Sequence, residues 1–167
     1  KDVNEGGAIG KIQDLIIEIN SLLSHDGLEV NILLGMENHL DEKLAVDIKN
    51  GNALPINKSR FILVEMPYVG QLGTSEENLL NVQNLGYVPI IAHPERMDIF
   101  QNDPELLRKF VGDGMLTQIT SGSLIGKFGD DAKLYAESIF KEGIGHILSS
   151  DTHMADGWRA PDILRGY

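Results

Sequence analysis

The sequence predicts an α/β protein with a parallel sheet, in a single domain over residues 1–167. Helix-type and strand-type patterns alternate along the chain, which is the order that successive βα units produce. The strand segments are continuously apolar, as expected where both faces of a sheet are covered. No linker-like stretch or change in composition divides the chain. We therefore expect one sheet and one core.

The apolar patterns predict two helices and two strands in the first part of the chain. Apolar residues over 9–23 repeat with the helical period, and Gly27 supplies a stop. A short apolar run predicts a strand over 28–34. Helical spacing returns from Leu40 and ends near Gly51, and a strand follows over 60–64.

The same alternation continues to the end of the chain. Thr74 and Glu77 have the spacing of a capping box, and they precede an apolar helix face that ends at Leu85. Asp103 and Pro104 are suited to a helix start. The remaining predicted elements are strands over 87–92, 115–119 and 144–148 and helices over 104–111 and 130–142.

Polar residues follow the predicted strands at a regular interval. Glu37, Glu65, His93 and Ser121 are spaced 28 residues apart, and Asp151 follows 30 residues later. About 28 residues is a plausible length for a βα unit, so one polar side chain is expected at the carboxyl end of each strand. In barrel-type α/β folds that rim carries the ligands and the catalytic groups.

The number of strands is small for a closed barrel. Five strands fall short of the eight units and roughly 250 residues of a complete barrel. The chain also starts at Lys1 on a helix with no strand before it. The sheet is therefore either open and doubly wound or the back portion of a larger barrel, and the absence of an initiator Met favours the second interpretation.

Composition excludes several classes of function. The chain has no Cys, which removes disulfides, thiolate metal ligands and cysteine nucleophiles. Its net charge of −11 argues against nucleic acid as a partner. No apolar run approaches the ~20 residues that cross a bilayer. P-loop, dinucleotide-binding and nucleophile-elbow motifs are also missing.

The polar residues of the predicted rim suit metal chemistry. Carboxylates and imidazoles without thiolates favour Mn, Fe or Zn, and a two-ion site would activate a water. Arg96 and Arg159 are suited to hold a phosphate. Each residue also has a structural interpretation: Asp151 as a helix cap, Arg96 as a local ion pair, and the others as loop residues. We expect His39 to face solvent and His146 to lie in the core.

Three motifs together resemble the bacterial capsule-type protein tyrosine phosphatases, which belong to the polymerase and histidinol phosphatase (PHP) superfamily. The motifs are IAHPER at 91–96, QITSGSLIGKFG at 118–129 and SSDTH at 149–153. The first and third occur across related hydrolases, whereas the middle block between the other two is more specific. The resemblance extends from Glu5 to Arg159, nearly the whole chain.

The resemblance implies a distorted, TIM-like (β/α)7 PHP barrel with two or three metal ions, commonly Mn2+, and Fe or Zn as alternatives. It implies a cytoplasmic enzyme with no membrane span that hydrolyses phosphotyrosine, through attack of metal-bound hydroxide, on a tyrosine kinase that regulates capsule or exopolysaccharide synthesis. It implies that Arg96 and Arg159 engage the phosphate. The metal ligands that it implies are Glu37, Glu65, His93, Asp151 and His153.

The chain departs from the family pattern at several positions. The His-x-His motif that opens family members and a later metal-binding His are not present, which matches the absence of about two βα units at the start. Met36 stands where relatives carry Gln, and Thr152 where Ala is commoner. Two alternatives therefore remain. One is a phosphoesterase acting on a small monoester such as histidinol phosphate, and the other is an inactive or assembly form, including a homo-oligomer that completes the barrel.

Overall fold

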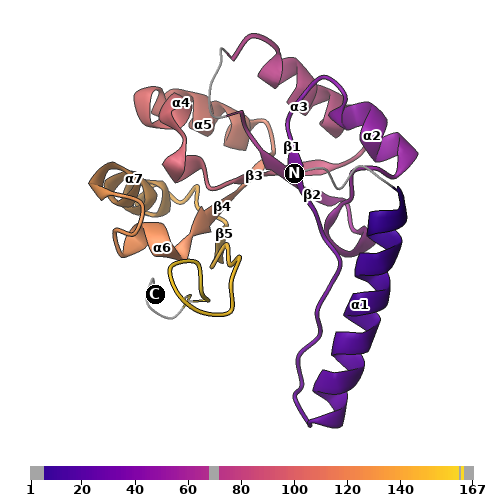
Figure 1. The fold of residues 1–167 in the computed structure, drawn as a ribbon. Coiled ribbons are helices and arrows are strands. Elements are labelled where there is room, and N and C mark those ends of the chain that lie inside the picture. Colours follow the sequence, from indigo (N-terminus) through magenta and orange to yellow (C-terminus); the bar gives the residue numbers. More distant parts are fainter. Residues whose placement is uncertain (1–5, 68–71, 162, 164–167) are drawn as a thin grey trace.

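The structure is a computed structural model that describes residues 6–67, 72–161 and 163. Its centre is a five-stranded parallel sheet in the order β1-β2-β3-β4-β5, with the helices arranged around it (Figure 1). The strands are β1 (Glu37–His39), β2 (Phe61–Glu65), β3 (Val88–Ala92), β4 (Leu116–Thr120) and β5 (Ile147–Ser149). The predicted α/β class and parallel sheet are confirmed.

Helices connect each strand to the next. The α-helices are α1 (Gly6–His25), α2 (Leu44–Asn50), α3 (Ser75–Asn84), α4 (Asp98–Asn102), α5 (Pro104–Gly112), α6 (Ser121–Leu124) and α7 (Asp130–Lys141). The described residues also form three 3-10 turns: η1 (Ile56–Lys58), η2 (Leu72–Thr74) and η3 (Pro94–Arg96). The strands lie in sequence order, and a doubly wound sheet would instead reverse direction at a switch point. The described strands contain no such reversal.

The core lies between the helices and one face of the sheet. In β2, Ile62 and Val64 are fully buried, whereas Phe61 and Leu63 are only partly buried. Leu79 of α3 and Leu107 of α5 belong to the same buried cluster. The second face of β2 is thus less covered by the described residues than its continuously apolar sequence predicts.

The predicted strand over 28–34 is wrong. This segment forms no strand with the other described residues and runs back along α1 (Figure 1), where the Asn20 side chain binds the backbone of Ile32 at 2.7 and 3.0 Å. A strand needs a hydrogen-bonded neighbour, and pairing of this part of the chain with the sheet begins only at Glu37, opposite Leu63. The other four predicted strands overlap β2 to β5.

Two smaller predictions are also wrong. Thr74 caps α3 without a side-chain hydrogen bond, so the capping box with Glu77 does not form. His146 is exposed rather than in the core, because it lies just before β5, where its Nδ1 atom accepts a hydrogen bond from the Thr117 backbone N–H at 3.2 Å.

Candidate metal centre

The parallel sheet brings three predicted ligands to one edge. Glu65 is the last residue of β2, His93 follows β3, and Glu37 opens the short strand β1. Because parallel neighbours end at the same edge, side chains distant in sequence meet there. Their ligand atoms all lie within 4.8 Å of one another, and among the described residues they form the group suited to hold a metal ion.

The contacts within this triad are short. His93 Nε2 lies 3.0 Å from Glu37 Oε1 and 3.4 Å from Glu65 Oε1. The His93 side chain is 3% exposed, whereas Glu37 and Glu65 are 32% and 23% exposed. The imidazole therefore forms the buried floor of the site and the carboxylates reach solvent. Two carboxylates and one imidazole are a donor set that suits Mn, Fe or Zn.

The charge state of Glu37 favours a ligand role. The hydrogen bond from His93 lowers the pKa of Glu37 against the opposing effect of partial burial, and the charges of His93, Arg96 and His153 lower it further. The Glu37 carboxyl is thus ionised at neutral pH, as metal binding requires. The influence of Arg96 and His153 also shows that a second group of site residues lies beside the triad.

That second group centres on Asp151, whose side chain is 8% exposed. Its Oδ2 atom accepts hydrogen bonds from Arg96 Nη1 at 2.7 Å and from Arg159 Nη2 at 2.8 Å. Arg159 Nη2 also lies 2.7 Å from His153 Nδ1. Two guanidinium groups therefore converge on one anionic acceptor at the edge of the triad, an arrangement that suits phosphate as well as carboxylate.

Backbone strain marks both parts of the site. His93 has φ of 34° and Asp151 has φ of 48°, in the left-handed region that side chains other than glycine rarely adopt. Such residues cost on the order of 1–3 kcal/mol each and persist where the surroundings hold them. The His93 N–H donates to the Gln118 carbonyl at 2.7 Å, which ties the strained turn to β4.

A buried carboxyl supports the turn that carries His93 and Arg96. Glu95 is fully buried, and its Oε1 accepts hydrogen bonds from the Thr120 N–H at 3.0 Å and from Ser123 Oγ at 2.7 Å. Burial raises the pKa of Glu95, although these bonds act in the opposite direction. The IAHPER motif thus places one polar residue in the core between two that face the site.

Two aromatic rings border the arginines. The Arg96 guanidinium lies 4.4 Å from the centre of the Phe128 ring. Phe128 in turn meets Trp158 edge to face, with ring centres 5.9 Å apart. The TSGSLIGKFG segment therefore contributes an aromatic support for Arg96 rather than a direct metal ligand.

The structure brings together some predicted site residues and not others. Glu37, Glu65 and His93 form the triad. Asp151 instead contacts Arg96 and Arg159, and His153 contacts Arg159. The assignment of all five as metal ligands stays a prediction.

His39, expected to face solvent, is 62% exposed but also lies 3.2 Å from Glu65 Oε2. The sequence did contain a signal that His39 lies near the site: it stands two residues after Glu37, and residues two apart in a strand lie on the same face.

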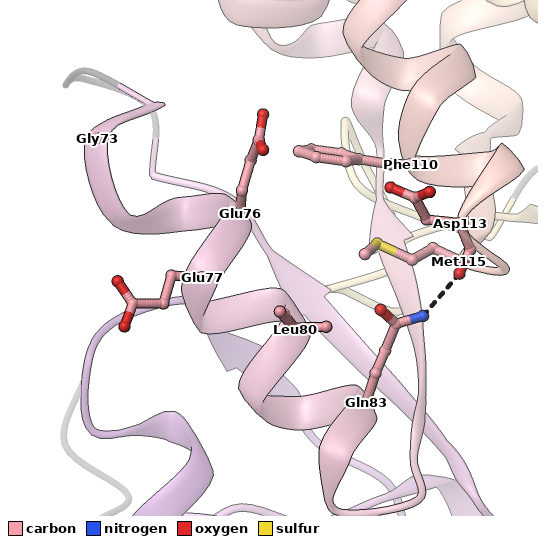
Figure 2. Close-up of a pocket in the computed structure, with 8 residues that line it drawn as sticks. All are labelled: Gly73, Glu76, Glu77, Leu80, Gln83, Phe110, Asp113 and Met115. Carbon is pink, nitrogen blue, oxygen red and sulfur yellow. Dashed lines mark hydrogen bonds between the residues drawn. The ribbon is translucent and has the colours of Figure 1, made fainter.

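A separate cavity lies away from the triad. A space of about 620 Å³ is lined by residues of α3 and of the end of α5, including Glu76, Leu80 and Met115 (Figure 2). Gln83 donates a hydrogen bond across it to the Asp113 carbonyl at 2.9 Å. Since Met115 precedes β4, this cavity adjoins the amino end of that strand, whereas the triad lies at the carboxyl ends. It contains none of the predicted site residues.

Comparison with known proteins identifies the family. A family model described as capsular polysaccharide synthesis, CpsB/CapC, matches residues 3–167. The chain belongs to the CpsB/CapC family. Tyrosine-protein phosphatase YwqE of Bacillus subtilis is 31% identical over 150 residues, which make up 90% of this chain and 58% of YwqE. Tyrosine-protein phosphatase CpsB of Streptococcus agalactiae is 26% identical over 164 residues, or 93% of this chain and 67% of CpsB.

The CpsB/CapC fold is confirmed by a solved structure. A chain from the crystal structures of YwqE and of CpsB from Streptococcus pneumoniae, described as unique metal-dependent tyrosine phosphatases, superposes with a TM-score of 0.84. It is 28% identical, and the match covers 98% of this chain and 64% of that chain. The present chain therefore spans a little over half the length of YwqE and under two thirds of the solved chain. None of the described helices is long and apolar enough to cross a membrane.

Proposed function

We propose that this chain carries the metal site of a metal-dependent phosphatase that hydrolyses phosphotyrosine on proteins. The observation that carries the proposal is the triad of Glu37, Glu65 and His93 directly beside the arginine pair, on one edge of the sheet. Membership of the CpsB/CapC family and the names of its relatives support the same activity. The natural substrate we propose is a bacterial tyrosine kinase that regulates capsule or exopolysaccharide synthesis.

We also propose that the sheet is part of a distorted (β/α)7 PHP barrel, of which residues 1–167 form a C-terminal portion. The consecutive order of five parallel strands supports this arrangement, because each crossover continues around the sheet in one direction. The greater length of the relatives supports it too. A cytoplasmic location remains a prediction from the family resemblance.

The residues of the site have distinct proposed roles. Glu37, Glu65 and His93 would hold the metal, with Asp151 and His153 as further ligands. When bound, the metal would lower the pKa of a coordinated water and offset the charge of the phosphate. Mn2+ is the ion we propose, because the oxygen-rich donor set and the family both favour it, with Fe and Zn as alternatives.

Arg96 and Arg159 would bind the substrate phosphate. Their guanidinium groups already converge on the Asp151 carboxylate at 2.7 and 2.8 Å, so they are oriented to receive an anion. Forked bonds to the non-bridging oxygens would stabilise the charge that builds up during transfer. As the P–O bond to tyrosine breaks, the leaving phenolate has a conjugate-acid pKa of about 10, so it departs more readily than an alkoxide.

The first test is metal content together with activity. Protein purified without chelator should contain Mn, Fe or Zn by elemental analysis and should hydrolyse a phosphotyrosyl peptide. His93→Ala should lose the metal and reduce kcat/KM by about 100-fold or more, since outer-shell partners alone account for about 10- to 100-fold. His25→Ala, at the exposed end of α1, is the matched control and should change neither quantity.

The alternatives give different outcomes in this test. Hydrolysis of histidinol phosphate in preference to the peptide would favour the small-monoester function. No metal and no activity, even after Mn2+ is added, would favour an inactive or assembly form. Unchanged activity in a folded His93→Ala variant, checked by circular dichroism, would refute the proposed metal site.

A further inference from the structure

The site has an exposed aromatic surface whose function the metal and phosphate ligands do not explain. Trp158 is 57% exposed, although it is the single tryptophan of the chain. It directly precedes Arg159, and its ring meets Phe128, which lies beneath the Arg96 guanidinium. A large apolar ring thus lies one residue before Arg159 in the chain and is linked to Arg96 through the Phe128 ring.

The position of this ring is fixed from two sides. The Trp158 carbonyl accepts a hydrogen bond from Lys127 Nζ at 3.2 Å, which ties its backbone to the residue before Phe128. The edge-to-face contact with Phe128 orients the indole. One face of Phe128 is occupied by Arg96, so the aromatic area that remains open to a ligand is mainly that of Trp158.

The chemistry of the substrate fits this surface. In phosphotyrosine the ester oxygen joins the phosphorus directly to an aromatic ring, so a phosphate held by Arg96 and Arg159 places that ring within a few ångströms of them. Aromatic rings pair favourably at centroid separations of about 4.5–7 Å. In phosphoserine the same phosphate is followed by an alkyl chain, which gains little from such a surface.

We propose that Trp158, supported by Phe128, binds the phenol ring of phosphotyrosine and gives the site its preference for aryl over alkyl phosphate esters. This inference rests on the proposed function and names the residue that determines its substrate class. Because the backbone, not the side chain, of Trp158 contacts Lys127, side-chain substitutions test the ring without breaking that hydrogen bond.

Fluorescence tests the contact without relying on catalysis. As the single tryptophan, Trp158 reports its own surroundings. At a fixed metal content, titration with phenylphosphonate should change the emission intensity and wavelength, whereas methylphosphonate should bind with little change. Equal responses to both phosphonates, or no response to either, would overturn the proposal.

Kinetics test the consequence for specificity. Trp158→Leu should lower kcat/KM about 3- to 10-fold for a phosphotyrosyl peptide and leave that for the matching phosphoseryl peptide unchanged, and Trp158→Phe should restore most of the loss. Equal losses on both peptides would mean that Trp158 only supports the loop, and the proposal would fail. If the unmodified protein hydrolyses neither peptide, the proposed function fails, and the phosphonate titration still decides whether the ring is bound.

Discussion

At the residue scale, Glu95 shows how a charged side chain can serve the site from within the core. It is fully buried between two residues that face the site, and it accepts hydrogen bonds from Thr120 and Ser123. Among the described residues its Oε2 atom has no hydrogen-bond partner, and burial raises its pKa against the opposing effect of the bonds from Ser123 and Thr120. Glu95 therefore connects the His93–Arg96 turn to the end of β4.

This connection predicts different effects for two substitutions at Glu95. Glu95→Ala leaves the Thr120 N–H and the Ser123 hydroxyl without their acceptor and creates a cavity, so it should lower the free energy of unfolding by about 2–4 kcal/mol. Glu95→Gln keeps the carbonyl acceptor and should cost less than half as much. Urea denaturation measures the free energy of unfolding of both variants. Equal losses would show that the hydrogen bonds of Glu95 do not account for its contribution to stability.

At the element scale, the turn that leads from α7 to β5 depends on a glycine. A Cβ atom added to Gly145 would come within 2.6 Å of the Phe140 ring at the end of α7. By contrast, a Cβ at Gly112, the last residue of α5, would meet nothing within 4 Å. Gly112 ends α5, and Gly145 lies between α7 and β5, so each glycine stands shortly before the strand that follows its helix and the two can be compared.

Substitution of these glycines should have effects of opposite sign. Gly145→Ala forces the Phe140 ring to move and should destabilise the fold by about 1–3 kcal/mol. Gly112→Ala should stabilise it by about 0.4–1 kcal/mol, because the unfolded chain loses freedom and the helix gains a better former. Thermal or urea unfolding compares the two variants, and a stabilising Gly145→Ala would contradict the close approach of the Phe140 ring to Gly145.

At the scale of the whole molecule, α1 and the segment after it form an apolar arm that projects from the sheet (Figure 1). We define the arm as residues 6–34. Its large apolar side chains are exposed over both the helix and the returning segment, and nothing among the described residues covers them. They are Ile12, Leu15, Ile17, Leu22, Leu28, Val30, Ile32 and Leu33. A large exposed apolar surface marks an interaction site or an aggregation hazard.

The exposed arm predicts self-association of the isolated chain. Sedimentation velocity should show a mass that rises with protein concentration, in line with the homo-oligomer considered from the sequence. The double variant Leu15→Lys with Leu22→Lys, whose positions lie two turns apart on α1, should shift the equilibrium toward the monomer without changing metal content. A wild-type chain that stays monomeric at all concentrations would contradict this role of the arm.

The sequence by itself determined the α/β class, the parallel sheet and the family, because helical and strand periodicities and local motifs are properties of neighbouring residues. The motif around His93 and the 28-residue spacing also predicted which side chains would reach one edge. The structure places Glu37, Glu65 and His93 together, although Glu37 opens β1 instead of following the predicted strand over 28–34, and Asp151 lies outside this triad.

Only the tertiary structure decided the path of residues 28–34 and the contacts around the site. Residues 28–34 have the composition of a strand but pair with no strand in the described part of the chain, and strand formation depends on a neighbour that the local sequence does not contain. The same holds for three features of the site. They are the convergence of Arg96 and Arg159 on Asp151, the burial of Glu95 and the exposure of Trp158, and each depends on how distant segments lie against one another. Such contacts depend on how the loops at the carboxyl edge fold over one another, which periodicity does not encode.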